Sequence, residues 1–153
     1  MARFPFAHRP KESYHERPRA FGSPRSNGAR KHAGCDLYAS PGTEVLAVED
    51  GTVVRGPYLF YDCVYALEVQ HMSGLIRYGE ISHSPEGIKP GVAVKAGQVI
   101  GFVGKMISVS ASMLHLEMYS GSGSGPLTVR DHKPYLRRPD LVDPTAFLDA
   151  CVL

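Results

Sequence analysis

Glycine and proline interrupt this sequence so often that it favours many turns and short strands over long helices. Sixteen glycines and twelve prolines are spread over 153 residues, with strand-like stretches between them. Short segments bounded by these two residue types are typical of strands. With 43% hydrophobic residues, the chain is long enough for one packed core and too short for two. We therefore expect a single, mainly β domain.

Turn signals and alternation predict where the strands lie. An Asp-Gly turn at 50–51 predicts a hairpin between strands at 43–48 and 52–55, because glycine accepts the positive φ of a tight turn. Further strands are predicted over residues 64–71, 75–82, 90–104 and 112–119, the first two as a second hairpin, followed by a loop over 120–140. A short closing helix is expected over 144–151, with Asp143 as its N-cap and Pro144 at its first position. The expected architecture is an antiparallel β-sheet or β-sandwich with a short C-terminal helix.

The glycine-rich segment at 91–104 also resembles the hairpins of biotinyl and lipoyl carrier domains. Such carriers display a lysine at a hairpin tip, beside Met or Asp. Lys95 lacks those neighbours, so we favour this interpretation less.

Positive charge is concentrated at the front of the chain. Residues 1–31 carry eight Lys and Arg against two acids, whereas the remainder carries nine against thirteen. Because the front shows no periodicity, we expect residues 1–30 to form a basic irregular arm and residues 31–153 to form the domain. Such an arm is either a solvated tail or faces a polyanion. Nucleic acid is disfavoured as a partner, because no recognition helix or RNA-binding aromatic motif accompanies the arm.

Cysteine usage and apolar runs bear on the compartment. Cys35, Cys63 and Cys151 are an odd number without C-x-x-C spacing, which favours neither a disulfide framework nor a thiolate zinc site. No apolar run approaches the roughly 20 residues of a membrane span, and the first residues lack the apolar block of a signal peptide. We expect synthesis in a reducing cytoplasm and no membrane contact. The sequence does not indicate an oligomeric state.

Two short motifs contain metal-ligating residue types. His32 and Asp36 are four residues apart, so their side chains fall on the same side of a strand or a helix. On the strand predicted over 112–119, alternation places Met113, His115 and Glu117 on one face. Either motif alone is weak, because such spacings arise by chance and a lone histidine among apolar residues is more often part of the core.

With their surroundings, these motifs resemble the lysostaphin-type peptidases, zinc endopeptidases that cut peptide cross-links of bacterial cell walls. The resemblance runs from about Arg30 to Leu148, and the order and spacing of several blocks match. The blocks are KHAGCDLYA at 31–39, PGT at 41–43, matched positions within 45–54 and 94–101, YG at 78–79 and LHLE at 114–117. The resemblance implies the duplicated hybrid motif fold, and Zn²⁺ bound by His32, Asp36 and His115. Two imidazoles and one carboxylate leave a coordination position open, as catalytic zinc sites do.

The chain departs from this family at two positions. The first histidine of the family's H-x-H motif is Met113 here, and the histidine of its Y-x-H segment is Glu80. In the family those histidines activate water and stabilise the transition state, whereas a thioether cannot transfer a proton. We hypothesise that Glu80 is the general base instead. The alternatives are that Glu80 caps a strand end or pairs with an arginine of the arm, or that it is a fourth zinc ligand.

Other side chains are weaker candidates for the site. The candidates for a group that stabilises the developing oxyanion are His83, Lys105, His132 and Arg25. Glu117 is expected either to accept a hydrogen bond from a ligand imidazole or to form a salt bridge in the sheet. Tyr135, Arg137 and Arg138 form either a groove for a peptide carboxylate or a solvated loop.

The resemblance and the departures lead to two functional hypotheses. The first is a zinc-dependent hydrolase that cleaves peptide bonds of bacterial peptidoglycan with a non-standard catalytic site. The alternative is a catalytically inactive, zinc-containing module that binds the cell wall or a protein partner. Lacking a signal peptide, the chain is expected to act at the periplasm or cell wall as a phage lysin or tail component, or as a secreted effector. A virion protein or an immunity protein would then be its partner.

Overall fold

The computed structural model of the protein describes residues 1–153 and contains eleven strands and one α-helix, α1 (Thr145–Ala150). A 3-10 turn, η1 (Ser26–Gly28), lies between the first two strands. The strands are β1 (Pro24–Arg25), β2 (Arg30–Lys31), β3 (Cys35–Tyr38), β4 (Glu44–Leu46), β5 (Gly51–Tyr61), β6 (Val64–His71), β7 (Gly74–His83), β8 (Ala93–Val94), β9 (Val99–Val103), β10 (Met113–Tyr119) and β11 (Leu141–Val142).

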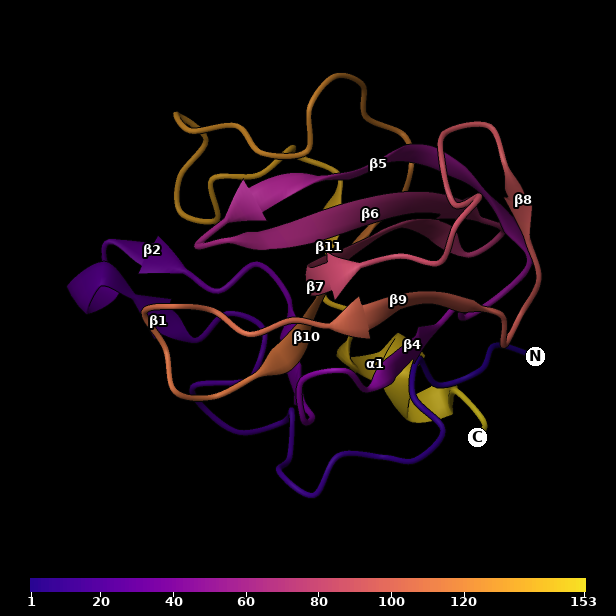
Figure 1. Ribbon diagram of the computed structural model, residues 1–153. Helices are drawn as coiled ribbons and strands as arrows, with labels where there is room; N and C mark the ends of the chain where they lie inside the picture. The colour runs from indigo at the N-terminus through magenta and orange to yellow at the C-terminus, as the bar shows by residue number, and fades with distance from the viewer.

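One antiparallel sheet contains nine of these strands (Figure 1). Its main path runs β11-β10-β7-β6-β5-β8, while β3 pairs with β10, and β9 pairs with both β4 and β7. The short α1 follows β11 near the C-terminus. This architecture confirms the mainly antiparallel β fold with a short C-terminal helix that the sequence predicts.

Of the two predicted hairpins, one is confirmed and one is wrong. Strands β6 and β7 pair from Tyr65↔Ile81 to His71↔Gly74, as the alternating pattern on either side of the turn indicates. In contrast, β4 does not pair with β5 across the Asp-Gly turn. It pairs with β9, while β5 pairs with β6 and β8. The turn residues are compatible with a hairpin, but both flanking strands pair with strands other than each other.

The first residues of the chain pack into the same core as the sheet. Phe4 and Phe6 are buried, and they join one cluster of 23 buried residues with side chains from the sheet and from α1. The backbone reinforces this contact, since Arg3 N–H donates to Val48 O at 2.8 Å and Phe4 N–H donates to Val152 O at 2.7 Å. Residues 1–30, which we call the strap, are largely irregular, and they are anchored to the domain at Phe4, Phe6 and Tyr14.

The C-terminal segment has the expected short helix. Asp143 accepts a hydrogen bond from the Thr145 backbone N–H at 2.9 Å, so its carboxylate satisfies one of the free donors at the start of α1. Pro144 directly precedes the helix, so α1 begins one residue later than predicted. Residues 120–140 form a loop whose only strand-like contact is the bridge Thr128↔Arg137. No helix in the structure has the length and apolar character needed to cross a membrane.

Candidate metal centre

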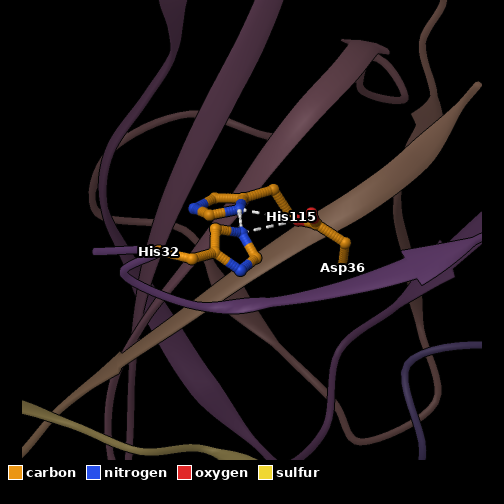
Figure 2. Close-up of side chains that lie close together, drawn as sticks. All are labelled: His32, Asp36 and His115. Carbon is orange, nitrogen blue, oxygen red and sulfur yellow. Dashed lines mark hydrogen bonds and ion pairs between the residues drawn. The ribbon is translucent and has the colours of Figure 1, made fainter. Parts of the chain in front are cut away.

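His32, Asp36 and His115 converge at one point, although they are up to 83 residues apart in sequence (Figure 2). Strands β3 and β10 pair so that Asp36 lies directly opposite His115. His32 comes from the loop between β2 and β3, four residues before Asp36. His32 Nε2 lies 3.0 Å from Asp36 Oδ1 and 3.2 Å from His115 Nδ1, and His115 Nδ1 lies 2.9 Å from Asp36 Oδ1. All three residues are buried.

Gly34 allows the loop between two of these residues to pass close to the backbone of β10. A Cβ at this position would lie 2.3 Å from Leu116 O, on the neighbouring β10, and 2.9 Å from the carbonyl carbon of the same residue. No larger residue fits there without moving the backbone. The close approach keeps the His32 side of the loop against β10, beside His115.

The hydrogen bonds of both imidazoles leave the converging nitrogens free to bind a cation. His32 Nδ1 lies 3.0 Å from Ala20 O, which can only accept, so this nitrogen carries the proton. His115 Nε2 lies 2.7 Å from Glu117 Oε2 and donates to that carboxylate. The opposite nitrogens therefore face Asp36 Oδ1, and each can present a lone pair to a cation that displaces the shared proton. Three acceptor atoms this close together require a proton or a metal ion between them.

This donor set suits zinc. Two imidazole nitrogens and one carboxylate oxygen are common ligands of catalytic zinc, and bonds of about 2.0–2.2 Å in a tetrahedron separate ligand atoms by about 3.4 Å. The observed separations of 2.9–3.2 Å need only a small expansion. His32, Asp36 and His115 thus form the one group of His, Cys, Asp and Glu side chains in the structure whose ligand atoms meet this way.

Charge is strongly coupled within this trio. Burial raises the pKa of Asp36, but hydrogen bonds from His115 and His32 outweigh it and lower the value to about 2. Burial lowers the pKa of His115, but Asp36 and Glu117 outweigh it and raise the value to about 10. Burial lowers the pKa of His32. The site therefore holds a fixed carboxylate and attracts positive charge.

Glu117 links His115 to a buried polar network. Its carboxylate accepts hydrogen bonds from Arg77 Nη2 at 2.8 Å, Arg137 Nε at 3.0 Å and Tyr119 OH at 2.5 Å, besides the one from His115. Burial raises the pKa of Glu117, but Arg77 and Arg137 outweigh it and hold the pKa well below its ordinary value. Glu117 therefore fixes the orientation and tautomer of His115.

Glu80 stands at a β-bulge next to the trio. In the pairing of β7 with β6, Gly79 lies opposite Ala66 and Ile81 lies opposite Tyr65, so Glu80 is the extra residue. Its φ is 66°, a left-handed conformation that is rare for residues other than glycine. The bulge re-aims the Glu80 side chain, which lines the same cavity as His115.

The carboxylate of Glu80 is buried, and only one of its two oxygens accepts a hydrogen bond. Tyr61 OH donates to Oε2, whereas Oε1 is buried without a hydrogen-bond partner. Burial raises the pKa of Glu80 to about 7, and the charge of His115 offsets part of this rise. A carboxylate with a free oxygen and a pKa near neutrality is suited to accept and return a proton.

A cavity of about 500 Å³ surrounds the trio. Besides the metal-ligating candidates and Glu80, its lining contains Arg25, Arg30 and Arg137. Arg25 Nη2 donates to Pro18 O at 2.7 Å and lies 3.5 Å from Asp36 Oδ2. All three arginines line the same cavity, and burial lowers the pKa of Arg30, with repulsion from Arg137 and Arg25 lowering it further.

The remaining predicted site residues lie elsewhere or have other partners. His83 is exposed at the end of β7, where its ring stacks on Phe102 at 4.7 Å between centroids. His132 is exposed in the 120–140 loop, and Lys105 Nζ donates to two backbone carbonyls. None of these three lines the cavity. Neither histidine is therefore placed to act on a substrate beside the trio.

Met113 lies where the resemblance expects a histidine. Its side chain is buried, packs with Val64 and Met106, and contributes to the cavity lining. Of the predicted carboxylate groove, only Arg137 lines the cavity. Tyr135 stacks on Phe21, and Arg138 pairs with Asp140 at 2.7 Å.

Among the polar residues that line this cavity, Tyr61 and Arg30 are not predicted by any sequence pattern. Tyr61 reaches Glu80 from the end of β5, because the pairing of β5 with β6 has three irregularities of register that alternation does not reveal. Arg30 sits inside the basic front segment, where nothing distinguishes it from seven other Lys and Arg residues.

The sequence is similar to known peptidases. A sequence profile of Peptidase family M23 matches residues 30–126. Glycyl-glycine endopeptidase ALE-1 of Staphylococcus capitis is 31% identical over 106 residues, which cover 69% of this chain and 29% of ALE-1. The chain thus matches less than a third of the length of that relative.

Solved structures share the fold. The catalytic domain of lysostaphin from Staphylococcus simulans superposes with a TM-score of 0.64 and 24% identity, covering 85% of this chain and 89% of that domain. A zinc containing peptidase from Vibrio cholerae has a TM-score of 0.59 and 21% identity, and covers all of this chain and 41% of that protein. At these identities, the superpositions show a common fold.

Proposed function

Because the chain belongs to peptidase family M23, the family that the sequence motifs resemble, we propose that it is a zinc-dependent hydrolase of peptide bonds in bacterial peptidoglycan. The observation that carries this proposal is the convergence of His32, Asp36 and His115, with one nitrogen of each imidazole facing Asp36 Oδ1 and the other nitrogen hydrogen-bonded from behind. The names of ALE-1 and of the Vibrio peptidase describe an endopeptidase and a zinc containing enzyme, which supports the reaction class and the metal.

In this proposal, His32, Asp36 and His115 hold the zinc ion. When bound, zinc supplies Lewis acidity toward the attacking water and the peptide carbonyl. Glu117 holds His115 in the binding tautomer, and the strap carbonyl of Ala20 does the same for His32.

Glu80 is the proposed general base. Its free Oε1 takes a proton from the attacking water and returns it to the leaving amine. Tyr61 donates to Oε2, so it orients the carboxylate and leaves Oε1 as the proton acceptor. The role of the family histidine thus passes to a carboxylate with a pKa near 7.

A second function is favoured by Met113, whose buried thioether cannot transfer a proton. The chain would then be a zinc-containing module that binds the wall or a protein without turnover. Incubation of the zinc-loaded protein with isolated sacculi separates the two functions, because only the enzyme creates new peptide termini.

Glu80→Gln tests the base directly. It should abolish the new termini while stoichiometric zinc is retained, and Glu86→Gln, at an exposed position, should leave both unchanged. Full turnover by Glu80→Gln would exclude this role, and a wild-type protein without turnover would leave the binding module.

The division of the chain and its delivery belong to the same proposal. Residues 31–153 are proposed as the peptidase domain and residues 1–30 as a basic arm that is anchored to it through Phe4 and Phe6. Action at the periplasm or cell wall, as a phage lysin or secreted effector with a virion or immunity protein as partner, stays a prediction.

A further inference from the structure

The arginines of the cavity differ in how their charge is balanced. Arg137 pairs with Glu117 at 2.9 Å, and Arg25 lies 3.5 Å from Asp36. Arg30 is half-buried, lines the same cavity, and has neither an ion pair nor a side-chain hydrogen bond. Its guanidinium is therefore the one uncompensated positive charge among the three.

The rest of the lining does not neutralise this charge. The only carboxylates that line the cavity are Asp36 and Glu80. Asp36 is engaged by both imidazoles, Glu80 accepts a hydrogen bond from Tyr61, and neither carboxylate forms an ion pair with Arg30. A partly desolvated arginine beside two like charges is unfavourable unless an anion pairs with it.

The other lining residues indicate what kind of anion fits. Met106, Val109, Met113 and Leu136 add apolar surface to the cavity. A peptide presents apolar groups and a carboxylate together, whereas a phosphodiester polymer of the wall presents mainly hydrated, polar groups. A planar guanidinium also matches a carboxylate through two parallel hydrogen bonds.

From these observations we infer that Arg30, with Arg25 and Arg137 beside it, binds a carboxylate of the substrate close to the bond that is cut. The inference rests on the proposed peptidase function and narrows its substrate to anionic stem peptides. The glycyl-glycine bonds in the name of ALE-1 carry no such charge. This chain is thus specific for a peptide that differs from a glycine bridge.

Two labelled stem tetrapeptides test the inference, one with every carboxylate free and the other with every carboxylate converted to a carboxamide. Their dissociation constants are measured by fluorescence anisotropy on the zinc-loaded Glu80→Gln protein, which leaves the peptides intact. We expect the free acid to bind about tenfold more tightly or better, as for a charge-assisted, two-point contact.

Variants assign this preference to Arg30. Arg30→Gln should remove most of it and Arg30→Lys should keep part of it, whereas Arg130→Gln, at an exposed position outside the cavity, should leave it unchanged. Equal binding of the two peptides, or a preference that survives in Arg30→Gln, would overturn the inference. So would displacement of the free acid by inorganic phosphate but not by acetate.

The two proposals fail in different ways. A carboxylate preference without cleavage of sacculi by the wild-type protein would refute the hydrolase and leave the anion site intact. Cleavage of sacculi without a carboxylate preference would do the reverse.

Discussion

Replacing Glu117 by glutamine should destabilise the protein and weaken metal binding together. Glu117 is fully buried, and the side chain of Arg77 is 1% exposed, so their contact at 2.8 Å lies outside the reach of solvent. Arg137 contacts the second carboxylate oxygen. Glutamine has nearly the same shape but no charge, so two guanidinium groups lose their counter-charge.

The size of the effect follows from this burial. Removing one partner of a buried ion pair costs about 3–5 kcal/mol, because the other charge stays buried and unpaired. In a domain of this size each kcal/mol lowers Tm by about 2–4 °C, so the expected fall is about 6 to 20 °C. Loss of the carboxylate charge behind His115 should also weaken zinc binding by about ten- to hundredfold.

Unfolding in urea with a chelator present measures the stability without metal, and competition with a chromophoric chelator measures zinc affinity. Arg77→Met in the Glu117→Gln background should cost much less than in the wild type, because it removes the uncompensated charge. Glu86→Gln, an exposed replacement, should change the unfolding free energy by less than about 0.5 kcal/mol. A change below about 1 kcal/mol in Glu117→Gln, or additive costs in the double variant, would show that the network does not carry this energy.

Three further predictions address the metal, a buried histidine and a close backbone contact. Zinc at about 100 times its Kd should raise Tm by about 5 to 10 °C in thermal melts of the wild type and of His132→Ala, but not of Asp36→Asn. Burial lowers the pKa of His71, so the unfolded chain binds a proton that the folded chain does not, and stability should fall as pH drops below about 6.5. In urea unfolding at about pH 5 and 7, the free energy of unfolding of His71→Gln should depend less on pH than that of the wild type, by up to about 1.4 kcal/mol per pH unit. An unchanged slope would contradict this prediction. Gly34→Ala should lower the free energy of unfolding by about 1–3 kcal/mol or more and abolish zinc binding, because its Cβ would meet Leu116 O at 2.3 Å. Gly87→Ala meets nothing within 4 Å, so it should lower the free energy of unfolding by only about 1 kcal/mol, from its positive φ. Zinc titration and urea unfolding of both variants check this comparison.

Local signals predicted the parts of the fold that depend on neighbouring residues. The β6–β7 hairpin has strong strand patterns on both sides of a short turn, so its pairing could be predicted. The partner of β4 is β9, more than 50 residues away, and nothing in a turn at 50–51 reveals that choice. Pairing of distant strands depends on packing in the whole core, and patterns in a single sequence do not report that packing.

The candidate site also contains residues that could be predicted from the sequence and residues that could not. The meeting of His32, Asp36 and His115 followed from the family resemblance, and the structure places the three side chains together. The position of Glu80 depends on a bulge, because regular alternation does not describe a strand with an extra residue. Arg30 was hidden by composition, since its uncompensated charge is visible only when its neighbours in space are known.

The strap also has a consequence for how the molecule is made. Phe4 shares its core with Leu148 and Cys151, and its backbone is hydrogen-bonded to Val152. During translation, the strap cannot pack against these partners until the segment around residue 150 has left the ribosome. The Ala20 carbonyl that orients His32 belongs to the same strap, so the nascent chain should acquire its full affinity for metal only after the segment around residue 150 has emerged and packed.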